Sequence, residues 1–85
     1  MKKEKVIVKN IEGLHIRPAS ELAKVTNQFK CDIQITVGER RANAKSILGI
    51  MSAGAKANDE IEFACEGEDE ETAINEIVKV FTKVI

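Results

Sequence analysis

The chain has 85 residues, of which 44% are apolar and 32% are charged, a balance typical of one globular domain spanning residues 1–85. A domain of this size buries only about 60–65% of the surface that its unfolded chain exposes. A deep, enclosed substrate cavity is therefore excluded, and we expect the protein to work at its surface. No apolar run approaches the ~20 residues of a membrane helix. The N-terminus does not resemble a secretory signal, so we expect a cytoplasmic protein without membrane insertion.

The charges are unevenly spread, although the formal net charge is only −1. Residues 1–45 hold 10 Lys and Arg against 5 Asp and Glu, whereas residues 46–85 hold 3 against 9. This pattern fits two solvated faces, or a basic rim around the single histidine that meets an acidic partner or an anionic group. Cys31 and Cys65 stand at apolar positions of alternating runs, and we expect both to be buried. One histidine and no CxxC pair predict no metal site.

The first half of the chain predicts a strand, a helix and a hairpin. A strand is expected over residues 4–9. A helix of about 11 residues begins at Ile16 or Arg17, because apolar residues then recur at helical spacing and Pro18 suits a first turn. Strict alternation predicts a strand over residues 31–37, and Gly38 and Glu39 turn it into a short strand at residues 40–43.

The second half predicts a short helix, a strand and a long helix. Ser46 and Gly54 have the residue types that begin and end a helix, although Gly49 weakens the segment between them. Residues 60–66 alternate as a strand. Asp69 is the expected N-cap of a last helix, whose apolar stripe ends at Val84 and Ile85. One-sided strands and one-sided helices together predict an α+β fold, an antiparallel sheet covered on one face by three helices.

His15 is the candidate reactive residue, although a single histidine can also be merely structural. It immediately precedes a predicted helix, whose first N–H groups can bind an anion. Arg17 can contact phosphate oxygens, so this arrangement suits a phosphoryl group carried on an imidazole nitrogen. No second base and no GxxxxGK loop accompanies it. We therefore expect no enzyme and no cofactor, and a phosphoryl group that comes from and goes to other proteins.

Ser46 is a second candidate site with a plain alternative. A serine at this position is usually just an N-cap, but the same helix start would favour a phosphate on it. Ile47, Leu48 and Met51 are either core residues or part of a docking patch. For Met51 the core interpretation is favoured, because methionine commonly fills gaps.

Two segments of the sequence carry a family resemblance. Residues 13–19, Gly-Leu-His-Ile-Arg-Pro-Ala, and residues 45–52, Lys-Ser-Ile-Leu-Gly-Ile-Met-Ser, closely resemble the two signatures of HPr, the histidine-containing phosphocarrier family of the bacterial sugar phosphotransferase system. The resemblance covers essentially the whole chain and implies the HPr open-faced β-sandwich. It implies that His15 accepts a phosphoryl group at Nδ1 from enzyme I and passes it to IIA domains of sugar permeases, with Arg17 in support.

The resemblance also implies regulation and docking. Ser46 would be phosphorylated by HPr kinase/phosphorylase, and the phosphorylated form would act as corepressor for a catabolite control protein. The partners would dock on a monomer through Ile16, Ser20, Ile47, Leu48 and Met51.

Three positions depart from the family pattern. Ile16 replaces a small residue, Leu48 replaces a methionine, and Glu12 would repel the phosphoryl group if its carboxylate faced the site.

Two alternative functions stay open. The first is a Crh-like regulatory paralogue acting mainly through Ser46, and the retained His15 argues against it. A nucleic-acid-binding domain is the second, and it is disfavoured because three Phe and no Trp or Tyr offer few stacking platforms.

Overall fold

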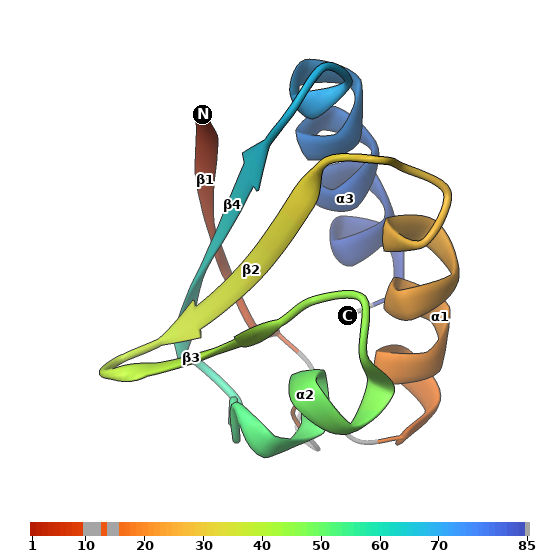
Figure 1. Ribbon diagram of the computed structural model, residues 1–85. Helices are drawn as coiled ribbons and strands as arrows, with labels where there is room; N and C mark the ends of the chain where they lie inside the picture. The colour runs from red at the N-terminus through yellow and green to blue at the C-terminus, as the bar shows by residue number, and fades with distance from the viewer. Residues whose placement is uncertain (10–12, 14–15, 85) are drawn as a thin grey trace.

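The computed structural model describes residues 1–9, 13 and 16–84, and Figure 1 shows one twisted sheet with helices packed on one face. The sheet has the order β1-β4-β2-β3, and every neighbouring pair is antiparallel. Its strands are β1 (Lys2–Ile7), β2 (Asp32–Val37), β3 (Arg40–Asn43) and β4 (Glu60–Glu66), and its helices are α1 (Ile16–Thr26), α2 (Ile47–Ser52) and α3 (Glu70–Val84). The predicted fold, a four-stranded antiparallel sheet covered by three helices, is confirmed.

The core lies between the two central strands and the helices. Register places Ile35 opposite Phe63 on the helix-facing side of the sheet, and both are fully buried. The ring of Phe63 meets that of Phe81 of α3 edge to face, with ring centroids 5.6 Å apart. The expected burial of both thiols is confirmed, with Cys31 3% exposed and Cys65 fully buried.

The first strand begins and ends two residues earlier than predicted. β4 continues to Glu66, so Lys2 and Lys3 can pair with Cys65 and Ala64 at the edge of the sheet. The strand ends at Ile7, and Val8, which follows it, is fully buried. The pattern of apolar residues therefore predicted which residues are buried but not where the hydrogen bonds between the strands begin and end. The predicted end of the last apolar stripe, Ile85, lies outside the described residues.

Asp69 stands just before α3, as predicted, but its carboxylate serves a different segment. Its Oδ2 accepts the N–H of Lys30 at 2.8 Å, and its Oδ1 accepts the N–H of Cys31 at 3.0 Å. These hydrogen bonds hold the pKa of Asp69 below its ordinary value. Burial and a hydrogen bond to Asp69 raise the pKa of the Cys31 thiol to about 12. That thiol therefore stays protonated at neutral pH.

Candidate functional site

The first turn of α1 contains both exposed and buried residues. Pro18 and Ala19 are buried, whereas Ile16, the first residue of the helix, is 63% exposed and Arg17 is exposed. Pro18 has no N–H to lose in this first turn, whose N–H groups have no intrahelical acceptors. The turn contains no acidic residue. His15 itself lies outside the described residues and precedes Ile16 in the chain.

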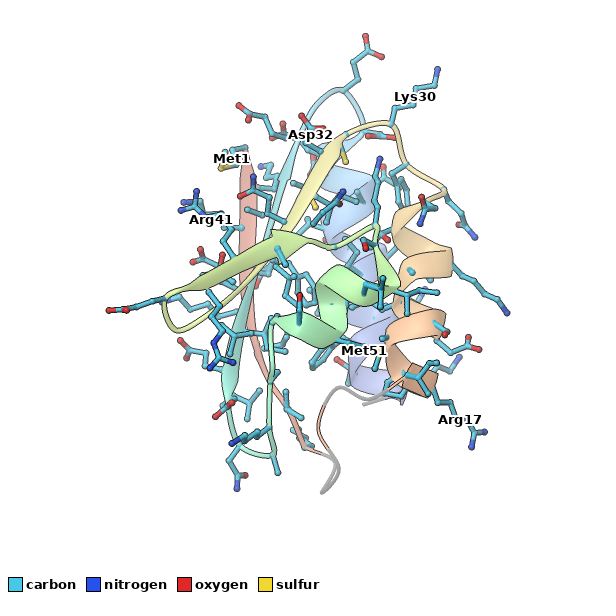
Figure 2. All side chains as sticks on the ribbon, turned by 60° about the horizontal axis from the view of Figure 1, so that its bottom comes forward. Met1, Arg17, Lys30, Asp32, Arg41 and Met51 are labelled. Carbon is cyan, nitrogen blue, oxygen red and sulfur yellow. The ribbon has the colours of Figure 1, made fainter. Side chains whose placement is uncertain are left out.

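Arg17 points away from the body of the protein. Figure 2 shows its guanidinium extending from the start of α1 into solvent. Among residues 1–9, 13 and 16–84, no carboxylate lies within ion-pair distance of it. Its planar fork of donors therefore remains available for an anion held near the start of α1.

Gly13 is required by two features of its surroundings. Its φ of +72° lies in the left-handed region, which residues with a Cβ rarely adopt. A Cβ built on it would also stand 2.5 Å from the carbonyl oxygen of Ala55. The residue two positions before His15 is thus packed directly against the chain between α2 and β4.

Ser46 is the predicted N-cap of α2. Its Oγ accepts the N–H of Gly49 at 3.0 Å, so the plain structural interpretation of Ser46 is confirmed. The structure also explains the unfavourable glycine inside this helix. A Cβ on Gly49 would lie 2.8 Å from the carbonyl oxygen of Asn43 and 3.2 Å from the Cβ of Ser46. Close packing of α2 on the end of β3 therefore favours glycine there.

A shallow groove of about 610 Å³ runs between α1 and the start of α2. The predicted docking residues Ser20, Ile47 and Leu48 line it, together with Ser46. Ile16 lies four residues before Ser20 on α1, and Met51 lies one turn beyond Ile47 on α2, so both extend the same surface. We define the docking face by the predicted residues: Ile16, Ser20, Ile47, Leu48 and Met51.

Most of the docking face is apolar and exposed. Leu48 is 78% exposed, Ile47 40% and Met51 36%. The core interpretation favoured for Met51 is therefore wrong. In Figure 2 its side chain lies on α2, on the surface beside α1. In α2 the inward position is taken instead by Ile50, which is fully buried, because a six-residue helix has only one narrow buried face.

The sequence pattern missed three residues of the groove, Lys24, Asn27 and Lys45. The Asn27 side chain donates to the carbonyl oxygen of Lys45 at 2.8 Å, and the Lys45 ammonium donates to that of Phe29 at 2.6 Å. These hydrogen bonds tie the end of α1 to the N-cap of α2. Helical spacing could have found two of the three, because Lys24 and Asn27 follow Ser20 by four and seven residues.

Of the two interpretations of the charge pattern, the spread of the described basic residues favours solvated faces over a basic rim. Figure 2 shows Arg17, Lys30 and Arg41 at widely separated places on the molecule, and Lys45 is engaged at the far end of α1. The charge excess of the first half is spread over several elements, because an antiparallel sheet distributes consecutive segments over the whole molecule. Of the described basic residues, Arg17 lies nearest to His15 in the chain, two positions after it.

Among residues 1–9, 13 and 16–84, no group of three or more His, Cys, Asp and Glu side chains could hold a metal ion. None of the described helices is long and apolar enough to cross a membrane.

Comparison with known proteins identifies the family. Residues 2–83 match the family model described as the PTS HPr component phosphorylation site. The chain is 44% identical over 84 residues to the phosphocarrier protein HPr of Mycoplasma pneumoniae, covering 98% of this chain and 96% of the relative. Its fold resembles that of a Mycoplasma histidine-containing phosphocarrier protein with a TM-score of 0.94 at 35% identity, over 96% of this chain and 93% of that one.

A more distant structure is Crh, the catabolite repression HPr of Bacillus subtilis. It matches with a TM-score of 0.78 and 30% identity, over 100% of this chain and 98% of that one. The chain belongs to the HPr family of the phosphotransferase system. Proteins of this family carry a phosphoryl group and have no independent catalytic activity.

Proposed function

We propose that the protein takes up a phosphoryl group on His15 from enzyme I and delivers it to IIA domains of sugar permeases in the cytoplasm. The observation that carries this proposal is the match of residues 2–83 to a family defined by a phosphorylation site, in a chain whose one histidine directly precedes α1. Histidine is the side chain best suited to accept and release a group near neutral pH.

The first turn of α1 supplies the environment that a phosphohistidine needs. In the transfer, the lone pair of Nδ1 bonds to phosphorus while the bond from phosphorus to the donor breaks. The phosphoryl group then carries two negative charges or nearly so. The positive end of α1, the absence of acids in its first turn and the exposed guanidinium of Arg17 all favour that charge. The helix N–H groups and Arg17 contact the phosphoryl oxygens only through noncovalent interactions. The bond between phosphorus and His15 is therefore the only covalent bond that must break when the phosphoryl group is passed on.

The docking face supports the proposal that the protein binds enzyme I and IIA domains. An exposed apolar surface of this kind on a small protein fits a binding site. Lys24 and Lys45 line the groove at this face and none of the described acidic residues does, so the charge there favours a partner with acidic side chains. We therefore expect enzyme I and the IIA domains to present an apolar depression edged by carboxylates. The protein would present this face as a monomer.

Phosphorylation by purified enzyme I tests the proposal. With phosphoenolpyruvate, the wild-type protein should form an adduct that is stable in base and lost in acid. His15→Ala should form none while keeping the wild-type unfolding midpoint in urea. Arg17→Ala should form the adduct but lose it to partners or water at a changed rate. Lys30→Ala is the matched control, because Lys30 is an exposed cation far from Arg17 in Figure 2. An adduct that persists in His15→Ala refutes the assignment.

Regulation through Ser46 is a second candidate, favoured by the similarity to Crh over the whole chain. Ser46 is half-buried, and its Oγ accepts one hydrogen bond, an acceptor role that a phosphate ester oxygen can also fill. HPr kinase/phosphorylase would be the modifying enzyme and a catabolite control protein the reader. Incubation with that kinase and ATP should label the wild type and not Ser46→Ala. If the wild type restores sugar uptake in a strain lacking its own carrier, regulation is not its main role.

A further inference from the structure

We infer that the turn at residues 55–59 positions the segment that carries His15, and that Asp59 is a positioning residue for phosphoryl transfer. This inference rests on the proposed function of His15. The 55–59 turn joins α2 to β4. Figure 1 shows this connection at the end of the sheet where α1 begins.

The turn holds the chain where it leaves β1. The N–H of Val8 donates to the carbonyl oxygen of Asp59 at 2.9 Å, and the N–H of Asn58 donates to that of Val8 at 2.8 Å. Val8 is fully buried, so this reciprocal pair is shielded from water. The main chain entering the segment of residues 9–15 is thereby fixed to the turn.

The turn also supports the middle of that segment. Gly13 is buried against the carbonyl group of Ala55, leaving no room for a Cβ. Ala55 is itself only 5% exposed. Two residues then separate Gly13 from Ile16, the start of α1. Val8 and Gly13, which precede His15 in the chain, thus both contact the 55–59 turn, and Ile16, which follows it, begins α1.

Asp59 closes the turn through its side chain. Its Oδ2 accepts the N–H of Lys56 at 2.9 Å, while its own N–H donates to the carbonyl oxygen of Lys56 at 3.0 Å. Asn58 has a φ of 72° and is the one non-glycine residue with a positive φ in the described part of the chain. Such a conformation persists where surrounding contacts determine it, and asparagine tolerates it better than most residues. The side chain of Asp59 supplies one of those contacts.

Three variants separate positioning from stability. Asp59→Ala removes the acceptor for the Lys56 N–H, and Asp59→Asn keeps an oxygen in that place. Glu70→Ala is the matched control, because Glu70 likewise accepts the N–H of the residue three positions earlier, Gly67, at 3.1 Å. Glu70 also pairs with the Met1 ammonium at 3.0 Å, so its removal should destabilise the fold at least as much.

We expect Asp59→Ala to lower the rate of phosphoryl transfer from enzyme I by about tenfold, mainly in kcat, because small misplacements of a reacting group are costly. Asp59→Asn should transfer at close to the wild-type rate, and Glu70→Ala should do so despite its lower urea midpoint. Equal rates for Asp59→Ala and Glu70→Ala overturn the inference. So does an Asp59→Asn variant as slow as Asp59→Ala.

Amide hydrogen exchange tests the turn without using transfer at all. Asp59→Ala should speed exchange at Val8 more than at residues of α3, and Glu70→Ala should not. If the wild type takes up no phosphoryl group, the proposed function fails while exchange at Val8 still reports on the turn. Unchanged protection of Val8 in Asp59→Ala refutes the positioning role in either case.

Discussion

Leu48→Ala offers the sharpest test of the docking face. Leu48 is 78% exposed, so its side chain contributes little to folding and is available to a partner. The substitution removes three carbon atoms. At ~0.8 kcal/mol for each buried methylene, complete burial of all three is worth ~2.4 kcal/mol. Scaling by the exposed fraction of 78% leaves ~1.9 kcal/mol for burial by a partner, which corresponds to ~20-fold in affinity.

The assay is the steady-state transfer of the phosphoryl group from enzyme I, with KM for the protein as the quantity measured. Leu48→Ala should raise KM by ~10- to 20-fold and change the free energy of unfolding by less than ~0.5 kcal/mol. Ile7→Ala is the control. Ile7 is 52% exposed and pairs with Glu60 on the face of the sheet away from the helices, where we expect no docking.

The outcome depends on the difference between these two variants. If both raise KM equally, exposed apolar area matters without regard to its position, and the docking face is not a specific surface. If neither does, the partners engage the protein elsewhere. A large fall in the stability of Leu48→Ala would contradict the exposure on which the estimate depends.

Three further predictions concern the scaffold of the site. Gly49→Ala should destabilise the protein by about 1–3 kcal/mol in urea unfolding, because the new Cβ would stand 2.8 Å from the Asn43 carbonyl oxygen; a gain in stability would show that helix propensity prevails. Ser46→Ala should cost about 0.5–2 kcal/mol through the lost N-cap, and Ser46→Asp, which keeps an acceptor for the Gly49 N–H, should cost less. The lowered pKa of Asp69 implies a contribution to stability that is present above its ordinary value of 3.8 and is lost as the pH falls through the folded-state pKa. In Asp69→Asn the urea midpoint should therefore decrease less between about pH 5 and pH 2 than it does in the wild type. The same decrease in both proteins would show that other carboxylates cause it.

The fold could be predicted from the sequence because its elements have strong local patterns. The buried faces follow from the alternation of Ile33, Ile35 and Val37 and from the helical spacing of Ile74, Ile77 and Phe81. The predicted ends of β1 were wrong because the ends of a strand depend on its partner strand, here β4, and not on local composition. The role of the Asp69 side chain was likewise invisible, since its hydrogen-bond partners lie 38 and 39 residues away.

The candidate site was predicted by residue type, and its surroundings were not. The sequence placed Arg17 in the first turn of a helix and Ser46 at an N-cap, because both positions obey local rules. It could not show that Met51 lies on the surface, since a short helix gives too few turns to define its buried face. It also gave no indication of Asp59, whose contact with Lys56 matters only because Val8 and Gly13 pack on the same turn.

The two layers of this fold are thin, and that thinness suits transfer between proteins. A group carried inside a cavity would require each partner to enter it, whereas one at the start of α1 can be approached across an open surface. The cost is that water reaches the same surface, so the carrier must slow hydrolysis with fixed charges and not with exclusion. In the proposed function, the positive end of α1 and the guanidinium of Arg17 would provide such charges if His15 is held in place. The proposed positioning role would therefore give the turn packed against Gly13 a function beyond fold stability.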